Sequence, residues 1–196
     1  MIHVYINNNS NKTLIMLHGT GGNENDMIGL AKRIDKNANI LSIRGRVVVN
    51  GMNRYFKRQG IGLYDLESYQ QETNYLIQSL LHFSNQYNFT LENATIVGFS
   101  NGANIALGVI QTNPIVNNYV LLSPDYINPN QNFGDLTNKK IFISTADDDP
   151  YVNNENMGLL IDRLTTNNSE LFVYKGSGHQ ISLEVLSNVI KWHQAN

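Results

Sequence analysis

The chain has 196 residues, a length that fits one domain better than two and is sufficient to bury a sizeable core. Hydrophobic residues make up 41% of it, which is too high for a disordered chain. Its net charge of −2, from 14 Lys plus Arg against 16 Asp plus Glu, gives no electrostatic case for binding nucleic acid or acidic membranes. The absence of cysteine excludes a disulfide scaffold, a thiolate metal site and a cysteine nucleophile.

The N-terminal segment Ile2–Ile6 reads as a strand, followed by an Asn-rich turn. We expect it to pair with the next apolar run, Thr13–Leu17, as a β-hairpin at the sheet edge. The start lacks the basic residues and longer apolar stretch of a signal peptide. No apolar run approaches the roughly 18 residues of a membrane span. These features predict a cytoplasmic protein without membrane insertion.

Short runs rich in Val, Ile and Leu recur along the chain, and each predicts a β-strand. The runs are nearly continuous rather than alternating, which is typical of strands covered on both faces in a parallel sheet. The expected strands are Thr13–Leu17, Asn39–Ile43, Ala94–Val97, Tyr119–Leu122, Lys140–Ser144 and Glu170–Tyr174.

The segments between these runs carry apolar residues at helical spacing, as at Leu183, Leu186 and Val189. Alternating strands and helices predict a three-layer α/β sandwich with a mostly parallel central sheet and right-handed crossovers. Arg44–Leu63 fits neither pattern, and a loop of that length in so short a chain is more often functional than idle. The expected helices are Glu24–Asp35, Leu66–Tyr87, Asn101–Gln111, Asn153–Thr166 and Ile181–His193.

The strand Ala94–Val97 runs into Gly98–Gly102, which reads Gly-Phe-Ser-Asn-Gly, and then into a predicted helix. In this context Gly-x-Ser-x-Gly indicates a nucleophilic serine, because the sharp turn projects its hydroxyl above the carboxyl end of the sheet. The helix N-terminus offers N–H groups and a positive dipole end to a developing oxyanion. A chance match is the alternative, and the flanking strand and helix argue against it. Ser100 is therefore the candidate nucleophile.

A serine hydroxyl needs a base to remove its proton, and histidine is the usual one. His179 lies between two predicted elements, in a glycine-flanked loop just beyond the last strand, at the same sheet edge as the serine. It is the candidate base. The remaining histidines are most simply surface, packing or loop-shaping residues: His3, His18, His82 and His193.

The third member of such a site is an acid on a loop after an intervening strand. The strand Lys140–Ser144 leads to a run of three aspartates at positions 147–149. A metal site is the weaker reading, because adjacent side chains point in different directions and no further ligand cluster supports it. Asp149 precedes a proline, which favours an extended backbone there. The pattern alone does not decide between Asp147 and Asp149.

The glycine-rich segment 18–23, His-Gly-Thr-Gly-Gly-Asn, follows the strand Thr13–Leu17. It does not complete a dinucleotide-binding or phosphate-binding loop pattern. Its backbone N–H groups are suited instead to half of an oxyanion hole, with the Thr20 amide paired to the amide of Asn101.

Four motifs in chain order resemble the small, capless phospholipase/carboxylesterase family of α/β-hydrolases, which includes the acyl-protein thioesterases. Within it, the chain looks nearest to bacterial hydroquinone-stress-associated carboxylesterases, which share an Arg-Gly…Asn-Gly-Met-x-Arg-Tyr/Phe-Phe pattern, here Arg44-Gly45 and residues 50–56. The resemblance covers nearly the whole chain. The four motifs are Leu17–Gly22, Gly98–Gly102, Asp149–Val152 and Gly178-His179.

The resemblance implies that the acid is Asp149 and that the oxyanion amides are those of Thr20 and Asn101. Ala146 departs from the family, which usually has glycine there, and Asp147 stays open as an alternative acid. The resemblance also implies one α/β-hydrolase domain over residues 1–196, without a lid domain.

Together these features predict a serine carboxylesterase for small or short-acyl esters, with a small-molecule ester as its partner and no metal or organic cofactor. Thioester hydrolysis or acyl transfer at the same triad is the runner-up, and a hydrolase-fold binding protein without turnover is the alternative from another class. The chain's size is compatible with a homodimer, although no self-complementary patch in the sequence argues for one.

The substrate pocket is the least specified feature. Arg54, Lys57 and Arg58 could steer an anionic substrate, although a solvated loop face is the simpler account. Ordinary core packing is the alternative for the apolar pocket candidates, which are Met27, Met52, Tyr55 and Phe56.

Overall fold

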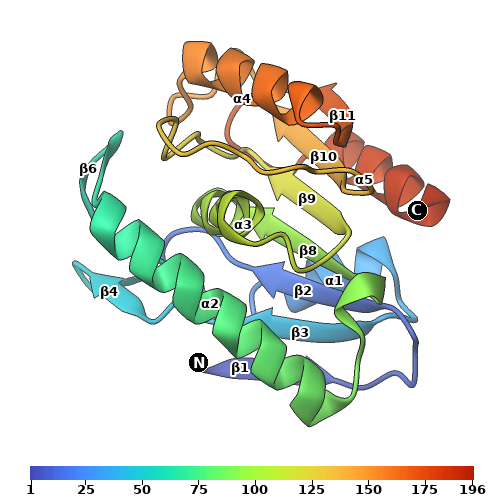
Figure 1. The fold of residues 1–196 in the computed structure, drawn as a ribbon. Helices are drawn as coiled ribbons and strands as arrows, with labels where there is room; N and C mark the ends of the chain where they lie inside the picture. The colour runs from blue at the N-terminus through green and yellow to red at the C-terminus, as the bar shows by residue number, and fades with distance from the viewer.

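The computed structural model describes all 196 residues as a three-layer α/β sandwich, as predicted (Figure 1). The central sheet has seven strands, in the order β1-β3-β2-β8-β9-β10-β11. All neighbours pair in parallel except β1 and β3, so six strands have their carboxyl ends at one edge. The strands are β1 (His3–Ile6), β2 (Thr13–Leu17), β3 (Asn39–Ile43), β8 (Ala94–Phe99), β9 (Asn118–Leu122), β10 (Lys140–Thr145) and β11 (Glu170–Lys175).

The predicted N-terminal hairpin is wrong. Strand β1 does lie at the sheet edge, but it pairs antiparallel with β3, in the register His3 to Ile43 and Ile6 to Ile40, and not with β2. The connection from β1 to β2 crosses the end of β3, where the Asn39 side chain holds it. Asn39 Oδ1 accepts from the N–H of Asn8 at 2.9 Å, and its Nδ2 donates to the carbonyl of Ser10 at 2.8 Å. These contacts favour insertion of β3 between the two strands.

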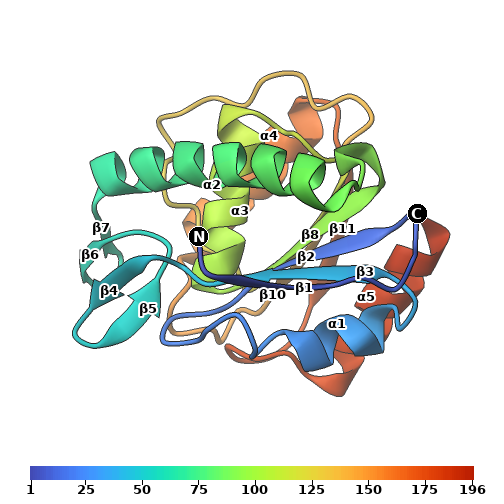
Figure 2. The same ribbon diagram turned by 90° about the horizontal axis from the view of Figure 1, so that it is seen from below.

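Helices cover both faces of the sheet (Figure 2). One face carries α2, α3 and α4, and the other carries α1 and α5. All five predicted helices are present, with ends that differ from the prediction by up to four residues. Their bounds are α1 (Ile28–Ile34), α2 (Leu66–Tyr87), α3 (Asn101–Thr112), α4 (Asn154–Thr166) and α5 (Leu183–Ala195).

Two apolar cores lie on the two faces of the sheet, and the alternation along each strand explains them. In β2, Ile15 and Leu17 join the core beneath α2 and α3, whereas Leu14 and Met16 join the core beneath α1 and α5. Every residue of β2 is buried, which is the pattern expected of a strand covered on both faces.

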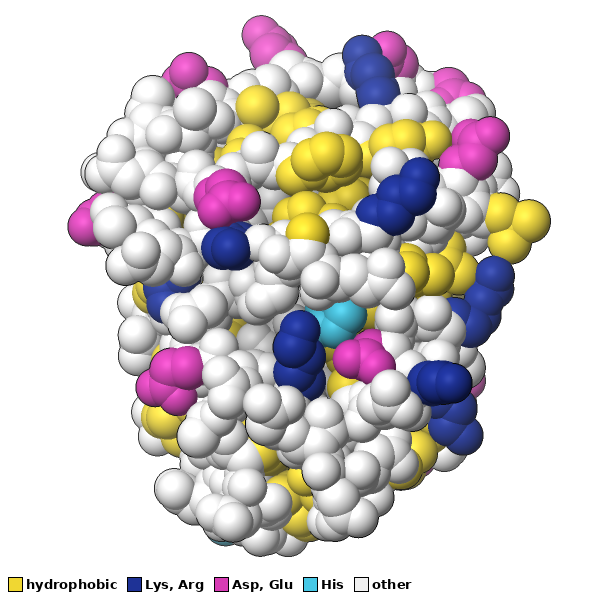
Figure 3. All heavy atoms as spheres, turned by 90° about the vertical axis from the view of Figure 1, so that its right-hand side faces the viewer, with side chains coloured by type: hydrophobic (Ala, Val, Ile, Leu, Met, Phe, Trp, Pro, Cys, Tyr) yellow, Lys and Arg dark blue, Asp and Glu magenta, His cyan; other side chains and the backbone are white.

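Strand β11, at one edge of the sheet, is more exposed than β2. Phe172 and Val173 are 44% and 38% exposed. Figure 3 views the molecule from the side on which α5 lies in Figure 1, and it shows hydrophobic side chains gathered on the upper part of this face, with charges of both signs scattered around them. No helix in the structure combines the length and the apolar character needed to cross a bilayer.

The segment 44–63, which fitted neither strand nor helix, folds into two small antiparallel ribbons beyond the sheet edge (Figure 2). They project at the end of the sheet where the strands' carboxyl ends lie, and they form one wall of the cavity described below. The four strands are β4 (Val47–Val49), β5 (Met52–Arg54), β6 (Arg58–Gly60) and β7 (Leu63–Tyr64).

Candidate active site

Ser100 occupies the turn between β8 and α3, with φ 51° and ψ −115°, a backbone conformation that side-chain-bearing residues rarely adopt. Close packing explains why glycines flank it. A Cβ on Gly102 would lie 2.1 Å from the carbonyl oxygen of Leu17, and one on Gly98 would lie 2.4 Å from the carbonyl oxygen of Gly102. The Ser100 N–H donates to the carbonyl of Leu122 at 2.9 Å, which ties the turn to β9.

Three side chains that are far apart in sequence form a continuous hydrogen-bonded chain. His179 Nδ1 lies 2.7 Å from Asp149 Oδ2, and His179 Nε2 lies 2.8 Å from Ser100 Oγ. An ionised carboxylate can only accept, so Nδ1 carries the hydrogen and Nε2 is left to accept from the serine hydroxyl. The imidazole also packs against two rings, Phe99 at 5.2 Å and Tyr151 at 4.9 Å between centroids, which limit its movement.

The three adjacent aspartates make three different contacts, as expected for neighbours whose side chains diverge. Asp147 pairs with Lys175 at 2.7 Å on the surface. Asp148 accepts from the Ser177 hydroxyl at 2.8 Å and from the Gly178 N–H at 2.7 Å. Only Asp149, which is buried, reaches the imidazole. The geometry therefore assigns the contact with histidine to Asp149 and leaves Asp147 outside the site.

Asp148 has a contribution that the sequence analysis missed. Its two bonds hold the loop that carries His179, and the N–H of Gly178 followed by the hydroxyl of Ser177 lower the pKa of its carboxyl below the ordinary value. The run of aspartates facing a Gly-Ser-Gly loop was the available signal, but sequence does not show which acid turns toward which loop.

The backbone N–H groups of the two residues predicted for the oxyanion hole have no hydrogen-bond partner in the protein. Asn101 is the first residue of α3, where the helix leaves its N–H groups without internal partners. Both residues line the same cavity as Ser100 and His179. The structure thus brings together the residues predicted for the triad and for the oxyanion hole.

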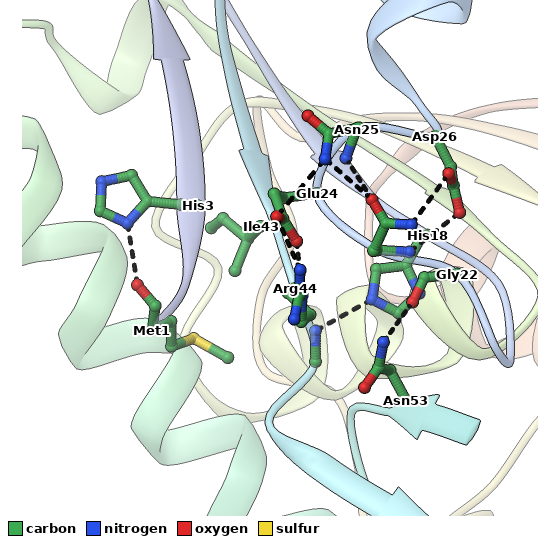
Figure 4. A network of polar contacts seen from close by, with 12 residues as sticks. Met1, His3, His18, Gly22, Glu24, Asn25, Asp26, Ile43, Arg44 and Asn53 are labelled. Atoms are coloured by element: carbon green, nitrogen blue, oxygen red, sulfur yellow. Dashed lines mark hydrogen bonds and ion pairs between the residues drawn. The ribbon is translucent and has the colours of Figure 1, made fainter. Parts of the chain in front are cut away.

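The loop bearing Thr20 is held by a network around His18 (Figure 4). The Gly45 N–H donates to His18 Nε2 at 3.0 Å, so His18 Nδ1 carries the hydrogen that it donates to the Gly19 carbonyl at 2.6 Å. Burial lowers the pKa of His18, which keeps the imidazole neutral in this role. The histidine that looked like a loop-shaping residue does shape this loop.

Further contacts in the same network join the loop to the 44–63 segment. The Gly21 N–H donates to the Asn53 carbonyl at 2.8 Å, and Asn53 Nδ2 donates to the Gly22 carbonyl at 2.9 Å. Arg44 Nη2 donates to Glu24 Oε1 at 2.8 Å, in a two-pronged ion pair drawn in Figure 4. These bonds fix the loop from outside the sheet.

A cavity of about 280 Å³ opens over Ser100 and His179. Of the four predicted pocket residues, Met52 lines it. The prediction is wrong for Met27, Tyr55 and Phe56, which are buried in the apolar cores.

Tyr55 shows why an aromatic in this segment belongs to the core. Its hydroxyl donates to the Ile43 carbonyl at 2.6 Å, and its N–H donates to Asn101 Oδ1 at 2.8 Å. It braces the start of α3 from below the cavity, and it does not meet the cavity itself.

The basic residues of the segment also differ from a solvated loop face. Lys57 is exposed, but Arg54 is 2% exposed, and both Arg54 and Arg58 line the cavity. Tyr64 and Asp125, which the sequence analysis did not single out, line it as well, with the Tyr64 hydroxyl donating to Asp125 at 2.8 Å.

Burial raises the pKa of the Asp125 carboxyl. Its place just beyond the carboxyl end of β9 was the signal that could have found it. The structure contains no group of three or more His, Asp or Glu side chains placed to hold a metal ion.

A serine, a histidine and an aspartate joined at the carboxyl edge of this sheet, with the serine on a strained strand-to-helix turn, define the α/β-hydrolase class. The sequence model of a family described as Phospholipase/Carboxylesterase matches residues 4–196, so the chain belongs to that family. Its fold and family make it a carboxylic ester hydrolase.

Individual relatives agree. The hydrolase MhqD of Bacillus subtilis (strain 168) is 30% identical over 196 residues, which cover 99% of this chain and 98% of that protein. The crystal structure of the Bacillus cereus carboxylesterase superposes with a TM-score of 0.94 at 30% identity, over 98% of this chain and 93% of that one. The structure of YahD with malic acid gives 0.93, also at 30% identity, over 99% and 98%.

Proposed function

We propose that this protein is a serine carboxylesterase that hydrolyses small or short-acyl esters through Ser100, His179 and Asp149, by way of an acyl-enzyme. The observation that carries the proposal is the unbroken chain of hydrogen bonds from Asp149 Oδ2 through the imidazole to Ser100 Oγ, at 2.7 and 2.8 Å. Ser100 lines the cavity, and so do Thr20 and Asn101, whose amides are the proposed oxyanion donors.

In the first half-reaction, Ser100 Oγ attacks the ester carbonyl carbon while its proton passes to His179 Nε2. The carbonyl oxygen becomes an oxyanion, and the amides of Thr20 and Asn101 donate to it. Asp149 holds the imidazole in the tautomer that accepts the proton and stabilises the imidazolium that forms. Collapse of the intermediate breaks the bond to the alcohol oxygen, which takes the proton from Nε2 and leaves.

In the second half-reaction, a water molecule attacks the acyl-enzyme carbonyl and gives a proton to His179 Nε2. The bond to Ser100 Oγ breaks, the proton returns to the serine, and the carboxylic acid leaves. Nothing is oxidised or reduced, and water is the only co-reactant.

The size of the cavity supports small substrates. A volume of about 280 Å³ lies at the lower end of ligand pockets, which span roughly 300–1,000 Å³. The segments between Ser100 and His179 form α3, β9, β10, α4, β11 and their connections, with no inserted helical cap over the site. A related protein, YahD, has been seen with malic acid, itself a small molecule.

Hydrolysis of p-nitrophenyl esters, from acetyl to decanoyl, tests the proposal. We expect activity on the short esters, a decline with chain length, and a loss of at least about 10³-fold in kcat in Ser100→Ala. Ser187→Ala, an exposed serine of α5, is the matched control and keeps full activity. Trapping with a fluorophosphonate should add one label, on Ser100. Hydrolysis that survives Ser100→Ala, or a label on another residue, would overturn the proposal.

A further inference from the structure

Arg54 is a buried cation without a carboxylate partner. It is 2% exposed, and no Asp or Glu oxygen lies within 4.0 Å of its guanidinium. Its Nη1 donates to Thr20 Oγ1 at 2.6 Å and its Nε donates to the Phe56 carbonyl at 3.2 Å. Of the five N–H groups of a guanidinium, the other three have no partner in the protein. The residue lines the cavity over Ser100.

A second cation lies beside it. Arg58 lines the same cavity and makes no ion pair. Burial, followed by the like charge of Arg58, lowers the pKa of Arg54 to about 10, which leaves the guanidinium charged at neutral pH. Burying a charge and placing a second of the same sign nearby both cost folding free energy. An anion bound between the two arginines would offset that cost.

Two other arginines of the chain do have acidic partners. Arg44 pairs with Glu24, and Arg46 pairs with Glu72. The cavity holds a single carboxylate, Asp125, whose oxygens accept from the Tyr64 hydroxyl at 2.8 Å and from the Tyr126 N–H at 3.0 Å. With two arginines against one aspartate, the cavity lining has an excess of positively charged side chains.

The contact between Arg54 and Thr20 places this charge next to the reacting centre. Thr20 supplies one of the two amides proposed to hold the oxyanion, and its side chain touches Arg54 directly. A ligand group that reaches Arg54 therefore lies in the same cavity as a carbonyl seated at Ser100. A guanidinium with free N–H groups is suited to bind a carboxylate through two parallel bonds.

We propose that Arg54, assisted by Arg58, binds a carboxylate on the substrate, so that the preferred esters are half-esters of small dicarboxylic acids or small hydroxy acids acylated on the hydroxyl, both of which keep a free carboxylate. This inference rests on the proposed esterase function, and it names the substrate class of the same site. Arg54 and Arg58 then determine specificity, and the triad determines the chemistry.

Two matched ester pairs test it. Monoethyl succinate against diethyl succinate varies the charge on the acyl side, and acetoxyacetate against 2-methoxyethyl acetate varies it on the alcohol side. The ratio of kcat/KM for charged to neutral ester is compared between variants, so that intrinsic ester reactivity cancels. On at least one side, Arg54→Gln should lower this ratio about 10- to 100-fold, the range for charge-assisted hydrogen bonds. Arg58→Gln should lower it less, about threefold to tenfold.

Two variants separate recognition from other effects. Lys57→Gln removes an exposed cation of the same segment that does not line the cavity, so it should leave the ratio within about twofold. Thr20→Val removes the hydroxyl that accepts from Arg54 and keeps the amide, so both esters should slow together. If Arg54→Gln also slows both esters equally, the arginine only positions Thr20 and the proposal is overturned.

A measurement on the unmodified protein covers the case in which Arg54→Gln does not fold. Succinate should inhibit neutral-ester hydrolysis at concentrations at least tenfold lower than succinamide, which has the same shape without the charges. Equal inhibition by the two overturns the carboxylate site. If the protein hydrolyses neutral esters through Ser100 and shows no preference for the charged esters, this inference alone is overturned. If hydrolysis of neutral esters survives Ser100→Ala, the esterase proposal itself is overturned.

Discussion

The two sides of the cavity are built in opposite ways. On the reacting side, Ser100, His179 and Asp149 satisfy one another through two short hydrogen bonds, and each follows the carboxyl end of a sheet strand. On the other side, Arg54 and Arg58 come from the ribbons of the 44–63 segment and have no acidic partner. The polar groups of the reacting side are paired with one another, whereas the arginine side has N–H donors without a partner in the protein.

The difference indicates a division of labour. Preorganised, internally paired groups act on charge that appears during a reaction, because they need no rearrangement when it forms. Unpaired buried charge instead costs stability until a ligand supplies the opposite sign. In the proposed function the reacting side would therefore act on esters in general, and the arginine side would select among them.

The largest test of the reacting side replaces Asp149 by Asn. An amide NH₂ facing Nδ1 would force the imidazole hydrogen onto Nε2, which could then no longer accept from Ser100. We expect kcat to fall about 10³- to 10⁴-fold with the fold intact, measured with p-nitrophenyl acetate.

Asp147→Asn is the matched control for this variant. The side chain of Asp147 makes only an ion pair with Lys175, and the two side chains are 72% and 64% exposed, so activity should stay within about twofold. The reverse result, with Asp147→Asn inactive and Asp149→Asn active, would contradict the proposed role of Asp149. It would mean that the acid in contact with the imidazole in this structure is not the acid that supports catalysis.

His18 links the two sides, because it bonds to Gly19 of the loop bearing Thr20 and to Gly45 of the segment that bears the arginines. Burial lowers its pKa below the ordinary 6.5, despite the opposing pull of Asp26 and Glu24. Between that lowered value and 6.5 the unfolded chain binds a proton that the folded chain lacks. The free energy of unfolding therefore decreases as pH falls through this window, by up to about 1.4 kcal/mol per pH unit. Above this window, His18 adds no pH dependence to the free energy of unfolding.

Urea unfolding at pH 7.5, 6.5 and 5.5 measures this slope. Burial also lowers the pKa of His193, so His193→Gln serves as the background in which to compare His18 with His18→Asn. The pH dependence should be shallower in the double variant. Equal pH dependence in the two variants would show that His18 can accept a proton in the folded state without a loss of stability. His18 would then not be held as a neutral link between the two sides.

The same contrast explains what sequence could predict. The reacting side was predictable, because a strand, a Gly-x-Ser-x-Gly turn and a helix are local features, and the carboxyl ends of parallel strands converge at one edge. Chain order suggested where the acid and the histidine stand. The choice of Asp149 over Asp147 needed the family resemblance or the structure, since side-chain direction within a loop is set by tertiary contacts.

The arginine side was not predictable in the same way. Met52, Tyr55 and Phe56 lie close together in sequence, yet one lines the cavity and two lie in the core. Arg54 lies between them in sequence and is buried beside Thr20. That position depends on the hydrogen bonds that join segment 44–63 to the loop bearing Thr20. The pairing of β1 with β3 failed for the same reason, because contacts between distant segments leave little trace in a single sequence.

Asp148 tests how much rigidity the reacting side needs. Asp148→Ala removes both bonds to the loop that carries His179, so the imidazole should spend less time in register with Ser100. We expect kcat to fall about threefold to tenfold, since the contacts are exposed and Phe99 and Tyr151 still flank the ring. Asp148→Asn keeps an acceptor for the Gly178 N–H and should recover part of the loss. Full activity in Asp148→Ala would show that packing alone positions the histidine.

The smallest expected effect is the most direct test of the arginine side, because it asks whether a buried cation stabilises the empty protein. Arg54→Met keeps much of the volume of the side chain and removes the charge that has no acid partner. We expect the free energy of unfolding to stay within about 1 kcal/mol of wild type or to rise, since replacing a poorly compensated buried charge by an apolar group is often neutral or stabilising. Arg44→Met, which breaks the ion pair with Glu24, should lower it instead.

Adding succinate should make wild type more stable to unfolding than Arg54→Met. At about five times its dissociation constant, a ligand that binds only the folded state adds about 1 kcal/mol, visible as a rise in Tm for wild type. Arg54→Met should gain little, and succinamide should stabilise neither. If Arg54→Met instead destabilises the empty protein strongly, the guanidinium is needed for its contacts with Thr20 and Phe56, and the two sides of the cavity are more alike than their ion pairs indicate.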